Sequence, residues 1–183
     1  VGRYATTPLI GANALGNPVQ LGGSAPDTLA TTGGNATLSG GLGNDTLSAA
    51  GDNNRILYAK GEGTDRVTTG GVGNVLGLGP GIAATDLKLK LGSLALQVGD
   101  DPNDIIHFDS FDANDALATR PFDSIEFEDG GTMTYAELLA LGFDIDGAAG
   151  DDNLTGTSVD DRIAGGAGND TVHGGAGNDR LDG

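Results

Sequence analysis

The sequence predicts an all-β chain: a right-handed parallel β-roll (a β-solenoid) in two blocks, separated by a small non-repetitive β-rich segment with one short helix. Three observations lead to this prediction. A nine-residue repeat recurs in two parts of the chain, glycine supplies 34 of the 183 residues, and each repeat carries one aliphatic residue at the same position. Self-similarity at a fixed short period is the sequence signature of solenoid folds.

The repeat is clearest in three close copies, which begin at Gly40, Gly165 and Gly174 and read Gly-Gly-x-Gly-Asn-Asp over their first six residues. Weaker copies keep the same phase, and the two inserted residues Tyr58 and Ala59 interrupt it once. Position 8 is aliphatic in all ten copies, and these residues are Leu29, Leu38, Leu47, Ile56, Val67, Leu76, Leu154, Ile163, Val172 and Leu181.

One aliphatic residue in nine is what a very short strand needs to point a single side chain into a thin core. The six glycine-rich residues predict a turn, because glycine reaches positive φ values at little cost. Two repeats then make one coil of about 18 residues, and successive coils stack about 4.8 Å apart like neighbouring strands. Side chains one coil apart therefore lie one above another.

Position 6 of the repeat is Asp in seven of the ten copies. Two carboxylates stacked at strand spacing can hold one Ca²⁺ between them, since Ca²⁺ takes oxygen ligands at about 2.3–2.6 Å. Turn carbonyls that no side chain covers can complete the coordination. Ordinary hairpin turns or a disordered linker would also use Gly-Asn-Asp, but neither gives a reason for an aliphatic residue in phase at every copy.

Composition narrows the function further. The formal net charge of −17 disfavours nucleic acid and anionic membranes as partners and favours small cations such as Ca²⁺. The absence of cysteine excludes disulfides, zinc–thiolate sites and cysteine nucleophiles. No apolar run approaches the roughly 18 residues of a membrane span, so we expect no membrane insertion by this chain.

No enzyme is expected either. The chain has no HExxH, GxSxG or Walker A motif. His107 and His173 have no spaced histidine or cysteine partner, which favours structural roles. Glu126 and Glu128 are a possible acid and base pair, but a solvated strand edge accounts for them better.

The segment between the repeat blocks contains all five phenylalanines, so we expect the aromatic core there. Thr134 and Glu137 form a capping box for a short helix that ends at Gly142. We expect the segment to pack on the open end of the first roll and shield its edge. Strands are expected at residues 87–91, 94–98, 105–108 and 124–128, the first two joined by a hairpin turn at Gly92-Ser93.

Residues 22–77 and 147–182 resemble RTX (repeats-in-toxin, haemolysin-type) calcium-binding repeats, and residues 78–145 are similar to the haemolysin-type calcium-binding-related segment that follows such blocks. The resemblance implies a lead-in at 1–21, a first β-roll at 22–77, a capping segment at 78–146 and a second β-roll at 147–183. It also implies how each ion is bound. The Asp at position 6 and the carbonyls at positions 1 and 3 of one turn are ligands. The Asp and the carbonyls at positions 2 and 4 of the turn one coil later complete the site.

Carried over to this chain, the pattern predicts about four Ca²⁺ sites. The aspartate ligands are Asp27, Asp45, Asp65, Asp152, Asp161, Asp170 and Asp179. The carbonyl ligands are those of Gly22, Ser24, Gly40, Gly41, Leu42, Gly43, Gly61, Gly63, Gly147, Ala149, Gly156, Ser158, Gly166, Gly168, Gly175 and Gly177. The opposite side of the first roll has Ala36, Asn54 and Asn74 at position 6, so we expect a weak ion there or none.

The resemblance implies a calcium-binding module of a secreted or surface bacterial protein, exported by type I secretion, that folds on meeting extracellular Ca²⁺. Its partners would be calcium ions and the rest of a longer parent chain, since the sequence begins at Val1 and ends in mid-pattern at Gly183. The parent could be a toxin, protease or lipase. Two alternatives stay open: a structural or adhesive segment of a large surface adhesin, or an accessory module of a secreted carbohydrate-active enzyme.

Overall fold

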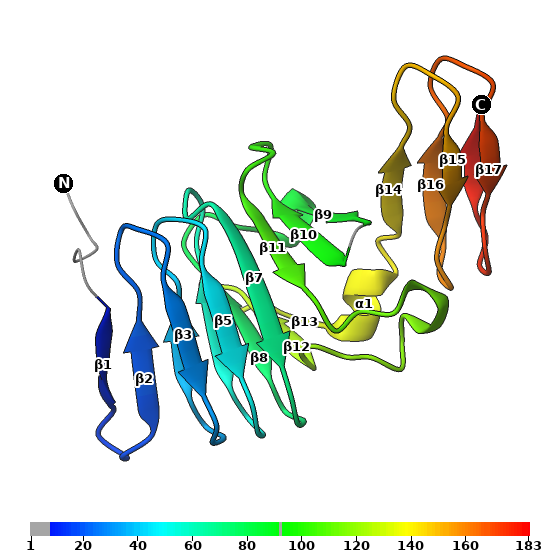
Figure 1. The fold of residues 1–183 in the computed structure, drawn as a ribbon. Coiled ribbons are helices and arrows are strands. Elements are labelled where there is room, and N and C mark those ends of the chain that lie inside the picture. The colour runs from blue at the N-terminus through cyan, green and yellow to red at the C-terminus, as the bar shows by residue number, and fades with distance from the viewer. Residues whose placement is uncertain (1–7, 92) are drawn as a thin grey trace.

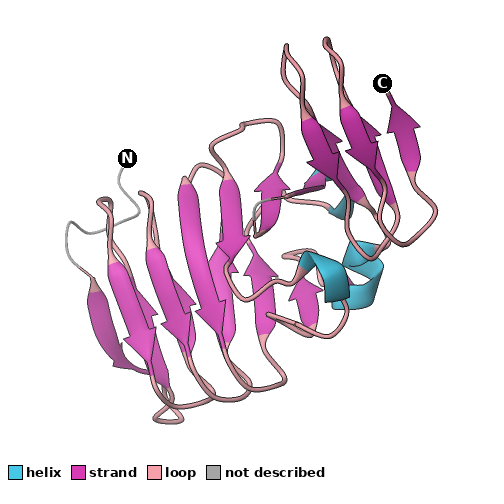
Figure 2. Cartoon of the chain, turned by 45° about the vertical axis from the view of Figure 1, so that its right-hand side comes forward, coloured by secondary structure: helices cyan, strands magenta, loops and turns pink. Residues whose placement is uncertain are grey.

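The structure, a computed structural model, describes residues 8–91 and 93–183. Within these residues it has eighteen β-strands, one α-helix and two short 3-10 helices. The strands form a seven-stranded sheet, a nine-stranded sheet and a two-stranded sheet (Figure 1). Figure 2 shows the two repeat blocks at opposite ends of the molecule, with the helix between them. The predicted β-solenoid in two blocks with one short helix is confirmed.

In the first roll, successive strands alternate between the two large sheets. β2, β4, β6 and β8 pair side by side in the seven-stranded sheet, while β3, β5 and β7 pair in the nine-stranded sheet, all in parallel. The strand bounds are β2 Pro18–Leu21, β3 Thr28–Thr31, β4 Thr37–Ser39, β5 Thr46–Ala49, β6 Arg55–Tyr58, β7 Thr64–Thr69 and β8 Val75–Leu78.

The register of these strands confirms the coil length. Leu29 lies opposite Leu47, 18 residues later. After the insertion of Tyr58 and Ala59, Leu47 lies opposite Val67, 20 residues later. Two extra residues therefore lengthen one coil without moving the core positions. All six position 8 residues of this block are at most 3% exposed, and they are Leu29, Leu38, Leu47, Ile56, Val67 and Leu76.

The N-terminal edge of the first roll is closed in two ways. β1 (Leu9–Ala12) pairs antiparallel with β2 and ends the parallel run of the seven-stranded sheet. In the nine-stranded sheet, the side-chain amide of Gln20 donates to the carbonyl of Ala30 at 2.6 Å and accepts from its N–H at 3.1 Å. The edge strand β3 thus has backbone groups satisfied by a side chain.

The middle segment extends both sheets of the first roll. β11 pairs in parallel with β7, and β12 pairs in parallel with β8, so the expected cover over the open end of the roll is confirmed. β9, β10 and β11 form an antiparallel meander. The strand bounds are β9 Leu87–Lys90, β10 Leu94–Val98, β11 Ile105–Phe108, β12 Ser124–Glu126 and β13 Thr132–Thr134.

Three details of the middle segment refine the prediction. The last strand ends at Glu126 rather than at residue 128, because the N–H of Phe127 donates to the carbonyl of Gly131 and closes a turn. The predicted helix is present as α1 (Tyr135–Leu139), with the capping box of Thr134 and Glu137 in place, and it ends at Leu139 rather than at Gly142. The predicted hairpin joins β9 and β10, although Gly92 itself lies outside the described residues.

The middle segment also has the aromatic core that its phenylalanines predict. The ring of Phe122 lies 4.9 Å from that of Phe108 and 5.3 Å from that of Tyr135, measured between ring centroids. All three side chains are at most 2% exposed. No helix within residues 8–91 and 93–183 is long and apolar enough to cross a membrane.

The second roll begins where β14 leaves the middle segment. β14 meets β9 at the single pair Phe143–Leu89 and then pairs in parallel with β16. The parallel pairing of the second roll thus starts at Phe143. The domain boundary that the sequence predicts after Asp146 stays a prediction. β14, β16 and β18 continue the nine-stranded sheet, and β15 and β17 form the two-stranded sheet. The bounds are β14 Phe143–Asp146, β15 Asn153–Thr155, β16 Asp161–Ala164, β17 Thr171–His173 and β18 Arg180–Asp182.

Candidate metal centre

The aspartates of the first roll form a stacked column on one side of the coils. The backbone N–H of Asp27 donates to Oδ1 of Asp45 at 2.7 Å, and the backbone N–H of Asp45 donates to Oδ1 of Asp65 at 2.9 Å. Each carboxylate is thus held directly beneath the turn one coil before it. The phase predicted from the sequence is confirmed for this column.

Burial makes this column electrostatically costly without a cation. Asp45 is 1% exposed and Asp65 is 2% exposed. Burial raises the pKa of Asp45, and burial together with the neighbouring charges of Asp45 and Glu62 raises the pKa of Asp65 to about 7. Oδ2 of Asp45 is buried and has no hydrogen-bond partner among the described residues. A buried acceptor without a donor costs about 1–3 kcal/mol, and more when it is charged, and a cation that meets it removes this cost.

Glycine lets the turns approach closely enough to share an ion. A Cβ at Gly22 would lie 1.8 Å from the carbonyl oxygen of Gly40, and one at Gly41 would lie 2.4 Å from that of Gly23. Gly41 also has φ +86°, a conformation that other residues adopt at a cost. Backbone carbonyls of one turn therefore face the next turn with no side chain between them, as a calcium site built on carbonyls requires.

The third turn of the column, residues 60–65, is joined to the middle segment. The carbonyl of Gly63 accepts from the hydroxyl of Tyr58 at 2.6 Å and from the N–H of Ile105 at 3.1 Å. The carboxylate of Asp104 accepts from the N–H of Gly61 at 2.8 Å. Both lone pairs of the Gly63 carbonyl thus have protein donors. Its role as an ion ligand stays a prediction, as does that of Gly61.

The second roll has one stacked pair on each side. The N–H of Asp152 donates to Oδ1 of Asp170 at 2.9 Å, and the N–H of Asp161 donates to Oδ1 of Asp179 at 3.1 Å. Asp161 is 2% exposed, and burial raises its pKa. The hydroxyl of Thr157 donates to the Asp161 carboxylate at 3.1 Å. The predicted pairing of these four aspartates is therefore present.

The turns of the second roll stack as closely as those of the first. A Cβ at Gly147 would lie 2.0 Å from the carbonyl oxygen of Gly165, and one at Gly156 would lie 1.9 Å from that of Gly174. The predicted carbonyl ligands lie in these stacked turns, while their assignment to particular ions stays a prediction. The remaining ones in this block are Ala149, Ser158, Gly166, Gly168, Gly175 and Gly177.

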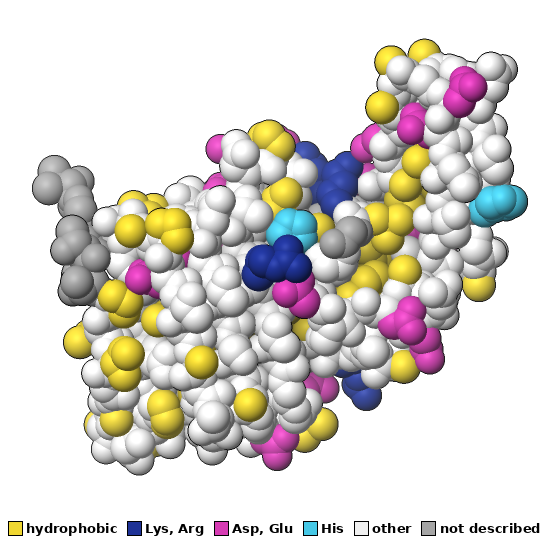
Figure 3. Space-filling view, viewed as in Figure 1, with side chains coloured by type: hydrophobic (Ala, Val, Ile, Leu, Met, Phe, Trp, Pro, Cys, Tyr) yellow, Lys and Arg dark blue, Asp and Glu magenta, His cyan; other side chains and the backbone are white. Residues whose placement is uncertain are grey.

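The structure offers the aspartate columns no side-chain cation. None of the seven repeat aspartates forms a salt bridge within the described residues. On the face shown in Figure 3, the Lys and Arg side chains gather near the centre of the molecule rather than over the turns at its two ends. The same described residues contain no group of three or more His, Cys, Asp or Glu that could hold a metal. An ion in these turns therefore depends on carbonyl oxygens.

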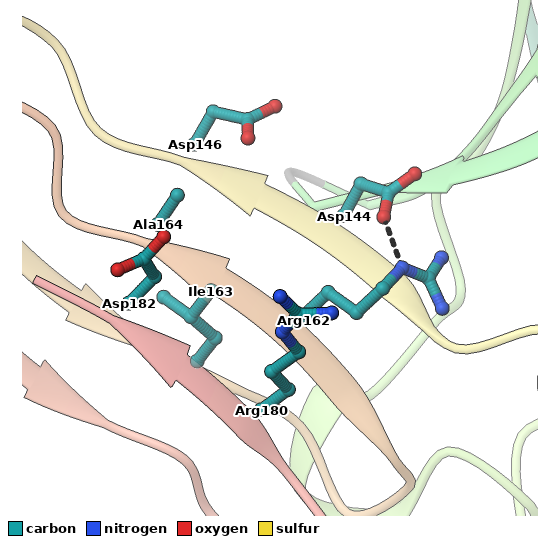
Figure 4. Close-up of a pocket in the computed structure, with 7 residues that line it drawn as sticks. All are labelled: Asp144, Asp146, Arg162, Ile163, Ala164, Arg180 and Asp182. Carbon is teal, nitrogen blue, oxygen red and sulfur yellow. Dashed lines mark hydrogen bonds and ion pairs between the residues drawn. The ribbon is translucent and has the colours of Figure 1, made fainter.

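Two acidic residues outside position 6 of the repeats, Glu126 and Asp144, are paired with arginines. Glu126 pairs with Arg55 across the seven-stranded sheet. In the shallow pocket on the outer face of the second roll, Asp144 accepts from Nε of Arg162 at 2.5 Å (Figure 4). His107 is half-buried on β11, and its Nδ1 lies 2.9 Å from Oγ of Ser93. These contacts agree with structural roles for the residues concerned.

Comparison with known proteins gives a family for the repeats. The model of the RTX calcium-binding nonapeptide repeat (4 copies) matches residues 21–56 and 155–183. These two regions fall in the two rolls; they include two of the four stacked aspartate pairs whole and the other two in part. No curated protein and no solved structure gives a significant match. The chain therefore carries RTX calcium-binding repeats in two regions, and the roll that they form is itself non-catalytic.

Proposed function

We propose, from the RTX repeats that the chain carries, that it is a module whose two rolls fold on binding Ca²⁺ outside the bacterial cell. The observation that supports this most strongly is Oδ2 of Asp45, which is buried and lacks a hydrogen-bond partner among the described residues. It lies in a column between Asp27 and Asp65. A hard divalent cation with oxygen ligands meets the need of such an atom.

Four ions are proposed, one for each stacked pair of aspartates. The pairs are Asp27 with Asp45, Asp45 with Asp65, Asp152 with Asp170, and Asp161 with Asp179. In each site the two carboxylates supply charge and the turn carbonyls supply neutral oxygens. Calcium is favoured over magnesium, since Ca²⁺ accepts six to eight ligands in irregular geometry whereas Mg²⁺ demands a near-ideal octahedron.

The free energy that ion binding would contribute to folding is large compared with the stability of a typical domain. One site contributes about 1.4 kcal/mol at a tenfold excess of ion over its dissociation constant. Four such sites give roughly 6 kcal/mol, which is comparable to the whole stability of a typical domain, about 5–15 kcal/mol. Without the ions, the buried carboxylates of each column repel one another and oppose folding.

The same dependence suits a secreted protein. The bacterial cytosol is poor in calcium and the outside is not, so a chain of this kind stays extended during export and folds on arrival. The net charge of −17 adds self-repulsion to the metal-free chain and keeps it from collapsing early. A secreted or surface location is therefore part of the proposal.

Far-ultraviolet circular dichroism tests the proposal. In EDTA the chain should have a weak β signal, and millimolar Ca²⁺ should restore a strong one, while equal Mg²⁺ should restore little. A β spectrum that is the same in EDTA and in Ca²⁺ would contradict calcium-dependent folding.

A further inference from the structure

On the two sides of the first roll, the side chains at position 6 of the repeat end in different atoms. Asp45 and Asn54 are nine residues apart, on opposite sides of the coils, and both are fully buried. Their Oδ1 atoms accept equivalent hydrogen bonds. That of Asp45 accepts from the N–H of Asp27, and that of Asn54 accepts from the N–H of Ala36 at 3.1 Å. The two side chains differ only in their second terminal atom.

In Asn54 that second atom is a donor which the turn uses. Nδ2 of Asn54 donates to the carbonyl of Gly51 at 2.8 Å and to that of Ala50 at 3.2 Å. Nδ2 of Asn74 likewise donates to the carbonyl of Gly70 at 2.7 Å. These carbonyls belong to the same turn as the asparagine that binds them. The amide therefore draws the carbonyls of the turn together from inside.

In Asp45 the second atom is the orphaned oxygen. Oδ2 is an acceptor that is buried and has no hydrogen-bond partner among the described residues, so no protein donor meets it. A cation placed there would contact the carboxylate and the carbonyls at once. The amide of Asn54 supplies positive N–H groups to its turn without any ion and without a net charge.

We infer that the residue at position 6 decides, face by face, whether the first roll is held by metal or by itself: Asn54 and Asn74 replace the cation with their own amide groups. The first roll then requires calcium on one face only, whereas the second roll requires it on both. This inference rests on the proposed function, because it assigns the calcium dependence to particular faces of the same rolls.

The decisive variant is the double substitution Asp45→Asn with Asp65→Asn, which puts the two asparagines of the opposite column into the aspartate column. Calorimetric titration with CaCl₂ should show a fall from about four bound ions to about two, because one site of this column loses one carboxylate and the other loses both. Hydrogen exchange in EDTA should show protection in β3, β5 and β7 that the unmodified chain lacks. A variant that still needs calcium to protect these strands would overturn the inference.

The reverse substitution, of Asn by Asp, is an independent test. Asn54→Asp with Asn74→Asp creates one new stacked carboxylate pair, so about one additional ion should bind per chain. Asn54→Ala with Asn74→Ala is the matched control, which removes the amide donors without adding charge and should bind no additional ion. If the aspartate variant binds no more calcium than the alanine variant, the inference is overturned. Failure of the proposed function is distinct, since then the unmodified chain would bind no calcium at all.

Discussion

The rolls and the middle segment are built around different interiors. In the first roll each coil contributes one aliphatic residue per strand, such as Leu47, and the turns enclose the buried carboxylates of Asp45 and Asp65. In the middle segment Phe108 and Phe122 pack against one another with no buried aspartate between them. On the proposed function, one region is completed by ions while the other is completed by apolar burial, although both belong to the same continuous sheets.

The proposed function makes the second roll depend on ions more than the first. Its position 8 residues include Leu154 and Val172, which are only partly buried, and Leu181, which is 51% exposed. In the first roll all such residues are buried. The second roll also has aspartates at position 6 on both sides, whereas the first has asparagines on one. Less apolar burial, together with repeat aspartates on both sides, should make the second roll the first region to unfold when calcium falls.

The largest single-residue effect is expected in the middle segment. Phe122→Ala should lower the free energy of unfolding by about 3–5 kcal/mol, because it removes a buried ring that contacts two others. The loss should be similar in calcium and in EDTA, as measured by urea unfolding followed through tyrosine fluorescence. Phe122→Leu is the control and should cost less than the alanine variant, because it keeps more of the buried apolar volume. A loss seen only in calcium would show that the aromatic core is not independent of the ions.

A smaller effect, with the opposite dependence on calcium, is expected in the aspartate column. Asp45→Ala should remove two sites and cost about 3 kcal/mol at a tenfold excess of calcium, while Asp27→Ala should remove one and cost about half as much. In EDTA the cost of both substitutions should be smaller, since the carboxylates that they remove then hold no ion. Asp115→Ala, at an exposed position, is the control. Equal costs for Asp45→Ala and Asp27→Ala in calcium titrations would refute the shared role of Asp45.

The smallest effect concerns the spacing of the turns. Gly22→Ala places a Cβ 1.8 Å from the carbonyl oxygen of Gly40, and such overpacking costs about 1–3 kcal/mol. Gly33→Ala meets nothing within 4 Å and should be close to neutral. Thermal unfolding in calcium compares the two. Should both variants melt at the temperature of the unmodified chain, the close stacking of the turns would be the wrong explanation for glycine at position 1.

Much of the fold follows from the phase of the repeat. The aliphatic residues at position 8 predict the strands, and the inserted Tyr58 and Ala59 predict the coil of 20 residues that the register shows. The order of the aspartates predicts which carboxylates stack. These features depend on local period, which a sequence displays directly.

Other features depend on contacts that no period encodes. The donors to the Gly63 carbonyl are Tyr58, from the insertion, and Ile105, from the middle segment. The amide bonds of Asn54 to its own turn need a rotamer that the sequence does not specify. The pairing of Gln20 with the backbone of Ala30 joins residues on different sheets. Two features of the sequence point to the first two of these contacts. One is a Tyr next to a glycine-rich turn, and the other is an Asn in place of the repeat Asp.

Hydrogen–deuterium exchange with peptide resolution tests the central claim most directly, because it reports on the rolls and the middle segment in one experiment. In EDTA, amides of the middle segment around β11, β12 and α1 should stay protected, while those of the second roll, from β15 to β18, should exchange freely. Addition of Ca²⁺ should protect the second roll and strengthen the first without changing the middle segment. Equal protection of all three regions in EDTA, or loss of protection in the middle segment together with the rolls, would contradict the division between an ion-built and an apolar interior.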